Sequence, residues 1–127
     1  MAELFYKDER DSEFFKICES VRVEKGVYAP IAEIVSQAIL MPTSSFFLHP
    51  KEYSNIIRGK NLPKNAIKRE LHLEIIRRHR DIKEKSPDLK THEIAKILDT
   101  QPAPRFYIST RRAVDLYYSL LKNRPRI

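Results

Sequence analysis

The stretch EIAKILDTQPAPRFYISTRRAVDLYYS, from Glu93 to Ser119, decides the predicted fold because a related stretch occurs earlier in the chain. Shifting the numbering by 60 places EIVSQAILMPTSSFFLHPKEYSNIIRG, from Glu33 to Gly59, on it without a gap. The matches fall at a helix-breaking proline and at the apolar residues around it, where structure restricts the residue type. We therefore interpret the chain as a tandem pair of related helical units. The matching positions pair Glu33-Ile34 with Glu93-Ile94, Pro42 with Pro102, and Phe46-Phe47-Leu48 with Phe106-Tyr107-Ile108.

The length and composition are those of one ordinary domain, or of two small units that share a core. The chain has 127 residues, of which 42% are hydrophobic and 32% charged. No apolar run is long enough to cross a membrane, and the N-terminus lacks the basic start and apolar core of a signal peptide. The single cysteine, Cys18, cannot form an internal disulfide. We therefore expect a cytoplasmic protein with no membrane partner and with Cys18 as a buried, inert thiol.

The net charge of +7 is spread unevenly along the chain. Residues 1–57 hold 6 Lys/Arg against 9 Asp/Glu, whereas residues 58–127 hold 18 against 8. An acidic first half joined to a basic second half indicates that a polyanion binds the second half. Solubility, or an acidic protein partner, would explain the same charge.

Helical periodicity of apolar residues predicts three helices in each half of the chain. Ser12 is expected to cap the first helix and Gly26 to end it. Pro30 is expected in the first turn of the second helix and Pro50 in that of the third. Thr91 is expected to cap the fifth helix, and Ser109 or Thr110 the last. The predicted ranges are 12–25, 29–41, 50–58, 66–85, 91–100 and 110–122.

The predicted fold class is all-α, a duplication of a three-helix, helix–turn–helix-like unit. The first, acidic unit spans residues 1–59 and the second, basic unit spans residues 60–127, and we expect the two to pack as one compact domain because neither has a sufficient core alone. Symmetry further suggests that the extended segments Phe46–Leu48 and Phe106–Ile108 pair as a small antiparallel ribbon between the two copies.

Metal, cofactor and catalytic sites are not expected. His72 and His79 lie two turns apart on one predicted helix, and no Cys or carboxylate joins them at a spacing typical of metal sites. The chain has no glycine-rich phosphate loop and no nucleophile elbow. We therefore expect that the protein is not an enzyme.

The basic second half favours DNA binding by a helix–turn–helix-like motif. Residues 91–100 would brace the helix 110–122, whose N-terminal side chains would enter the major groove. The intervening turn of about nine residues, with two prolines, is longer than the usual three or four, so the motif would be a variant. Exposed arginines in the first turn can reach guanine edges or phosphates, and further cations would contact the backbone. The expected nucleic-acid-binding residues are Arg105, Arg111, Arg112, Lys64, Lys68, Arg77, Arg78 and Arg80.

A structural or adaptor protein is the alternative hypothesis. The acidic first half and the Phe46-Phe47 segment would then dock a protein partner, and nucleic acid would not bind. The first copy has Ser45, Lys51 and Glu52 at the positions of Arg105, Arg111 and Arg112, so nucleic-acid binding is expected of the second copy alone.

The box from Pro102 to Ser109, followed by Ala113, resembles a segment of short, basic bacterial and phage proteins that have no known activity. The resemblance covers about the last third of the chain. It implies a bacterial, phage or mobile-element setting, in which a small regulator or accessory factor is expected, and it transfers no functional residues.

Overall fold

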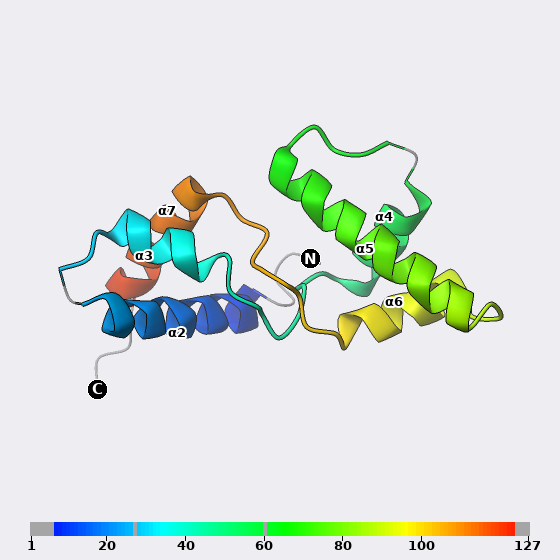
Figure 1. The fold of residues 1–127 in the computed structure, drawn as a ribbon, viewed down its shortest axis with the longest axis horizontal. Coiled ribbons are helices and arrows are strands. Elements are labelled where there is room, and N and C mark those ends of the chain that lie inside the picture. The colour runs from blue at the N-terminus through cyan, green and yellow to red at the C-terminus, as the bar shows by residue number, and fades with distance from the viewer. Residues whose placement is uncertain (1–6, 27, 60, 124–127) are drawn as a thin grey trace.

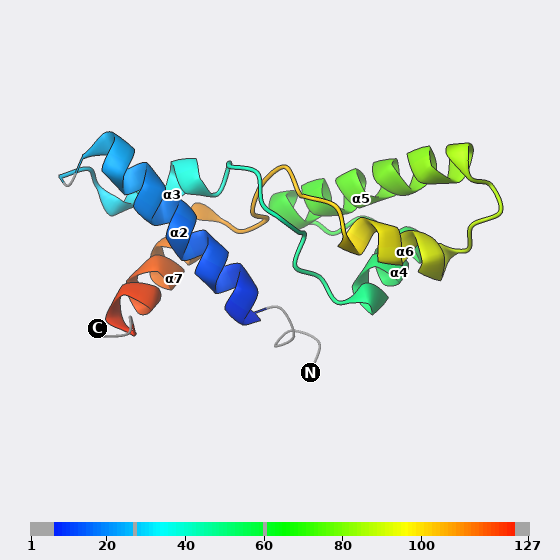
Figure 2. The ribbon, with the colours of Figure 1, turned by 90° about the horizontal axis from the view of Figure 1, so that it is seen from below.

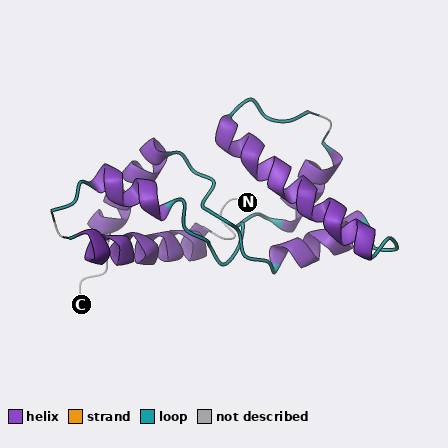
Figure 3. Ribbon diagram, viewed as in Figure 1, coloured by secondary structure: helices purple, strands orange, loops and turns teal. Residues whose placement is uncertain are grey.

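The computed structural model describes residues 7–26, 28–59 and 61–123. These residues form six α-helices and no strand, which confirms the all-α prediction (Figure 3). None of these helices is long and apolar enough to cross a bilayer. The helices are α2 (Lys7–Lys25), α3 (Ile31–Ala38), α4 (Pro50–Arg58), α5 (Ala66–Lys85), α6 (Thr91–Asp99) and α7 (Thr110–Lys122).

The first two helices differ from their predicted ranges. Helix α2 begins five residues before Ser12, at Lys7, and Asp8 and Glu9 in its first turn complement the helix dipole. Ser12 is therefore not the cap. Pro30 is the N-cap of α3, rather than a residue of its first turn, and α3 ends at Ala38. The predicted extension to Met41 is wrong because residues 39–41 turn toward Pro42.

The later helices agree closely with prediction. Helices α4, α5 and α7 have the predicted bounds, with Pro50 in the first turn of α4 and Ser109 as the cap of α7. Thr91 is the first residue of α6 and not its cap, because the N-cap is Lys90. The Lys90 backbone N–H donates a hydrogen bond to Glu93 Oε1 at 3.0 Å, which replaces the expected threonine cap.

The six helices form two lobes, which Figures 1 and 2 show side by side. Lobe 1 contains α2, α3 and α7, and lobe 2 contains α4, α5 and α6. Each lobe has its own apolar core, and helices of different lobes do not pack on one another. The core of lobe 1 includes Phe14, Cys18, Val21, Val35, Phe106 and Tyr117, and that of lobe 2 includes Phe46, Tyr53, Ile75, Ile94 and Leu98.

Each lobe takes two helices from one part of the chain and one from the other. Helix α4 follows α3 along the chain but packs in lobe 2, and α7 follows α6 but packs in lobe 1. The linkers that carry this exchange are residues 39–49, before α4, and residues 100–109, before α7 (Figure 1). The lobes therefore divide the helices differently from the sequence units 1–59 and 60–127.

The two linkers meet at an isolated antiparallel bridge between Thr43 and Ala103. The Thr43 N–H donates to the Ala103 carbonyl at 2.9 Å, and the Ala103 N–H donates to the Thr43 carbonyl at 3.0 Å. The predicted ribbon between 46–48 and 106–108 is therefore wrong. The linkers pair three residues upstream, at this bridge, and the Phe106 N–H donates to the Ile39 carbonyl at 2.9 Å instead of to residues 46–48. Thr43 and Ala103 are 60 positions apart, which is the shift that places the two related stretches of sequence on each other.

Aromatic rings, rather than backbone hydrogen bonds, join the segments expected to form the ribbon. Phe46 stacks on Tyr107 with ring centroids 6.1 Å apart, and Phe47 stacks on Phe106 at 6.2 Å. The 60-residue shift relates the two stacks, because it places Phe46 on Phe106 and Phe47 on Tyr107. Because Phe46 lies in the core of lobe 2 and Phe106 in that of lobe 1, the two stacks fix the crossing of the linkers to both lobes.

Cys18 lies fully buried in the core of lobe 1. Burial, with a smaller contribution from the neighbouring Glu19 carboxylate, raises the pKa of the Cys18 thiol to about 12. A thiol with so high a pKa carries almost no thiolate at neutral pH and is therefore unreactive in the folded protein.

Candidate nucleic-acid interface

A groove of about 390 Å³ lies between the two lobes. Its lining comes from α2, both linkers, the N-terminal part of α5 and the N-terminal part of α7. In Figure 1, α5 and α7 both begin beside the gap that separates the lobes. The exchange of α7 into lobe 1 therefore places the starts of two helices that are distant in sequence on opposite sides of one groove.

Among the residues that the structure describes, the charged side chains that line the groove are all cationic. They are Arg10 from α2, Lys68 from α5, Arg105 from the second linker and Arg112 from α7, and no described carboxylate belongs to the lining. Four cations in one concave surface with low-dielectric walls raise the local concentration of anions.

Ion pairs divide the four groove cations into two classes. The Arg10 guanidinium lies 3.0 Å from the largely buried carboxylate of Asp11, and that of Arg105 lies 3.4 Å from Glu70. Lys68 and Arg112 are exposed and make no ion pair with any residue that the structure describes. These two cations, one from each lobe, are the most available to an incoming anion.

Side-chain caps fix the start of each helix at the groove. Asn65 Oδ1 accepts hydrogen bonds from the backbone N–H groups of Ile67 (3.0 Å) and Lys68 (3.1 Å). On the other side, Ser109 Oγ accepts from the Arg112 N–H at 3.2 Å. These bonds hold Lys68 and Arg112 in the first turns of their helices, where the helix dipole adds to the positive potential.

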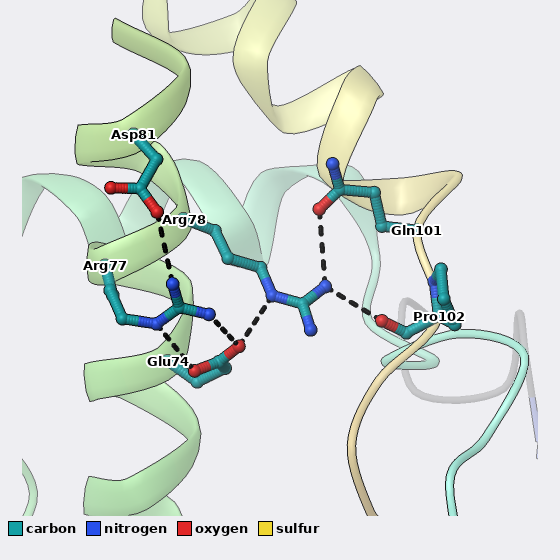
Figure 4. Close-up of polar contacts among 6 residues, drawn as sticks. All are labelled: Glu74, Arg77, Arg78, Asp81, Gln101 and Pro102. Carbon is teal, nitrogen blue, oxygen red and sulfur yellow. Dashed lines mark hydrogen bonds and ion pairs between the residues drawn. The ribbon is translucent and has the colours of Figure 1, made fainter. Parts of the chain in front are cut away.

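The Arg78 side chain makes its polar contacts with other residues of the protein. Its side chain is 19% exposed, and its guanidinium bonds to Glu74 Oε2 (2.7 Å), to Gln101 Oε1 (3.3 Å) and to the Pro102 carbonyl (2.8 Å), as Figure 4 shows. The guanidinium also lies 4.8 Å from the centre of the Phe46 ring. Arg78 thus joins α5 to the second linker and to the first aromatic stack.

The neighbouring Arg77 is exposed but paired. It forms ion pairs with Glu74 at 2.8 Å and with Asp81 at 3.1 Å along the same helix (Figure 4). Hydrogen bonds from Arg77 and then Arg78 outweigh burial and lower the pKa of Glu74 below its usual value. Glu74 is therefore the shared anion of both arginines.

The remaining predicted residues occupy exposed positions on both lobes. Arg111 lies in the first turn of α7, Lys64 precedes α5, and Arg80 lies in the C-terminal half of α5. None of the three forms an ion pair within the described residues. Lys64 and Arg111 are each close in sequence to a capped helix start at the groove.

The predicted pairing of α6 with α7 is wrong. Helix α7 packs on α3 and α2, whereas α6 packs on α4 and α5. The nine-residue turn with its two prolines does not fold α7 back on α6. It carries α7 into the other lobe instead, because the Thr43–Ala103 bridge directs the linker across the molecule.

Phe46 and Phe47 are not an exposed docking segment. Phe46 is 7% exposed and belongs to the core of lobe 2, and Phe47 is half-buried against the core of lobe 1. The Phe46 ring instead packs against Tyr53 and Tyr107, so Phe46 offers little surface to a partner, and the adaptor hypothesis stays a prediction.

The histidines of α5 are half-buried and lie beside cations. Burial, with Lys68 near His72 and Lys83 near His79, lowers both histidine pKa values below the usual 6.5. Both imidazoles are therefore mainly neutral at pH 7. No group of three or more His, Cys, Asp or Glu residues in the described part of the chain is arranged to hold a metal ion.

Arg10 is the groove residue that the sequence did not indicate. It lies on α2 in the acidic half of the chain, and its position in the groove follows from the packing of α2 with α7.

Comparisons with protein-family models, with curated proteins and with solved structures found no match to this chain.

Proposed function

We propose that this protein binds DNA and that the groove between the lobes is the centre of its binding surface. The observation that carries the proposal is the lining: four cations from both lobes and no described carboxylate. Phosphate contacts supply most of the affinity in sequence-independent binding, and unpaired Lys and Arg side chains make them. Lys68 and Arg112 are the primary contacts, and Lys64 and Arg111 extend the surface beyond the groove.

Arg78 and Arg105 have a supporting role in this proposal. The Arg78 guanidinium pairs with Glu74 and lies over the Phe46 ring. The Arg105 guanidinium pairs with Glu70 and lies over the Tyr107 ring. A guanidinium already bound on several sides offers few free donors to a phosphate. Arg77 and Arg80 lie on α5 outside the groove lining and would contact only a long ligand.

Helix α7 is a candidate reading helix in a rearranged helix–turn–helix-like unit. It packs on α3, which comes from the other half of the chain and takes the bracing position first expected of α6. Arg111 in its first turn is exposed and unpaired within the described residues, as a base-contacting or phosphate-contacting residue requires.

A duplicated ancestry is consistent with this design. The contact of α3 with α7 corresponds, under the 60-residue shift, to that of α6 with α4, and the two aromatic stacks correspond in the same way. We suggest that two related units exchanged their third helices and that one acquired the cations. A role as a small regulator or accessory factor in a bacterial, phage or mobile-element setting fits the resemblance of the Pro102–Ser109 box.

Removing the two unpaired groove cations tests the proposal. The double variant Lys68→Gln with Arg112→Gln is expected to bind duplex DNA about tenfold or more weakly, since a hydrogen bond to a charged group contributes about 1.5 kcal/mol. The slope of log K against log salt should fall by about 0.9 for each phosphate that the variant no longer neutralises. Fluorescence anisotropy of a labelled duplex over a series of salt concentrations measures both quantities.

A matched control separates the groove from overall charge. The double variant Lys16→Gln with Lys96→Gln removes the same charge from exposed positions on α2 and α6, away from the groove. It should change affinity and slope much less. Equal losses for the two double variants would mean that net charge, and not the groove, determines binding.

A protein-docking function is favoured by a different observation. In the described part of the first half, four large apolar residues are exposed, Val23 (84%), Tyr28 (97%), Leu40 (62%) and Met41 (40%). This alternative predicts that a complex formed through lobe 1 is unaffected by the Lys68→Gln and Arg112→Gln substitutions and that DNA does not bind.

A further inference from the structure

We propose that the groove holds a single strand of nucleic acid, with a base against its apolar lining and the flanking phosphates on its cations. This inference rests on the proposed function and specifies the form of nucleic acid that fits. It follows from three features of the groove: its mixed lining, its placement of cations on both sides, and an unusual backbone conformation at Phe47.

The lining combines apolar surface with positive charge. Besides the four cations, the groove is lined by Phe47, Leu48, Ile67 and Ile108. A duplex presents phosphates and base edges and keeps the faces of its bases inside the stack, so it cannot cover this apolar surface. A single strand exposes the faces of its bases, and binding sites for single strands combine a positive groove with surfaces on which bases pack.

The dimensions and the polar groups also suit a single nucleotide unit. The volume of about 390 Å³ lies in the range typical of pockets for small organic ligands. Lys68 and Arg112 stand on different lobes, so a strand lying between them has a cation for phosphates on either side. Asn65 uses its Oδ1 for capping, and its amide nitrogen donates to no other described group, which leaves a donor for a base edge.

Phe47 has a backbone conformation that a bulky residue rarely adopts. Its φ is +57°, and within the described residues no other non-glycine residue has a positive φ. Ser45 Oγ accepts the Phe47 N–H at 3.0 Å, and the ring stacks on Phe106 at 6.2 Å. Tyr107, its counterpart 60 residues later, has no positive φ. The crossing of the two linkers alone therefore does not require a positive φ at this position. Strained residues concentrate at functional sites, and Phe47 is one of the residues that line the groove.

The test compares a labelled oligothymidylate with a duplex of equal length under the same salt conditions, by fluorescence anisotropy. The single strand should bind several-fold more tightly. Phe47→Gly should weaken single-strand binding by about fivefold or more, the effect expected when one base loses its packing surface, with the salt slope unchanged. Duplex binding should change little. Glycine adopts the positive φ freely, so this variant keeps the backbone conformation.

Leu48→Ala provides a second variant of the lining if Phe47→Gly loses its fold, as judged by circular dichroism. It should also weaken single-strand binding selectively. Duplex binding equal to or tighter than single-strand binding would overturn this inference and leave the proposed function standing. Unchanged single-strand binding in both variants would overturn it as well. Binding of neither ligand at low salt would overturn the proposed function itself.

Discussion

Replacing Tyr117 by alanine is expected to destabilise the protein by about 3–5 kcal/mol, the cost typical of truncating a large core aromatic residue. Tyr117 is fully buried in lobe 1, where its ring lies 5.9 Å from that of Phe15. Its hydroxyl donates a hydrogen bond to Glu19 Oε1 at 2.7 Å, which joins α7 to α2. Because native domains are stable by only about 5–15 kcal/mol, this single change removes a large part of the stability.

Two further substitutions separate the contribution of the buried Tyr117 ring from that of its hydroxyl. Tyr118→Ala changes the next residue of α7, whose side chain is 55% exposed, and should alter the free energy of unfolding by about 0.5 kcal/mol or less. Tyr117→Phe removes only the hydroxyl and should cost about 1.5 kcal/mol, since the hydroxyl donates to the Glu19 carboxylate. Urea unfolding followed by circular dichroism measures all three. Equal stability of Tyr117→Ala and Tyr118→Ala would contradict the packing of α7 in lobe 1.

Arg78→Ala is expected to destabilise the protein by about 2–3 kcal/mol. The substitution removes charge-assisted hydrogen bonds from a largely buried guanidinium, leaves the Pro102 carbonyl without this donor, and removes the cation over Phe46. The expected loss is larger than for a surface ion pair because Arg78 connects α5 to the linker that leads to α7 (Figure 4).

Arg77→Ala is the matched control for Arg78. Arg77 precedes it on α5, pairs with the same Glu74, and is 58% exposed. Exposed pairs contribute about 0.2–1 kcal/mol, so Arg77→Ala should be the milder change in urea unfolding. Arg78→Lys keeps the charge but lacks the planar fork and should fall between the two. A loss for Arg77→Ala as large as that for Arg78→Ala would contradict the structural role of Arg78.

Local sequence signals predicted the helices well where they are strong. Helix α5 has the predicted bounds because Asn65 caps it and Ser86 follows its last turn, and Pro50 and Ser109 mark the starts of α4 and α7 in the same way. The start of α2 was missed because residues 7–11 carry no apolar periodicity. Their helix is stabilised by charge, with Lys7 paired to Asp11 at 3.7 Å.

The exchange of helices between lobes could not be read from the sequence. Either packing of α7, on α6 or on α3, buries Ala113 and Tyr117, so periodicity alone does not choose between them. The choice depends on the direction of the linkers, which the Thr43–Ala103 bridge and the aromatic stacks determine through contacts 60 residues apart. Local patterns carry no information at that separation.

The candidate interface was predicted in part. The charge of the second half pointed to Lys68, Arg105 and Arg112, which the structure brings into one groove. It could not show that Arg78 is held by Glu74 and Pro102, nor that Arg10 joins the groove from the acidic half. Whether a cation is exposed, paired or buried depends on tertiary packing, which net charge does not report.

Titrating a labelled random-sequence DNA duplex with this protein, by fluorescence anisotropy at low and at physiological salt, tests the central claim most directly. The groove predicts binding in about the micromolar range at low salt that weakens steeply as salt rises, because bound counterions are released when phosphates meet Lys and Arg. Absence of binding at low salt, by this duplex and by a single strand of equal length, would contradict the account, and the cationic groove would then need an acidic protein surface as its partner.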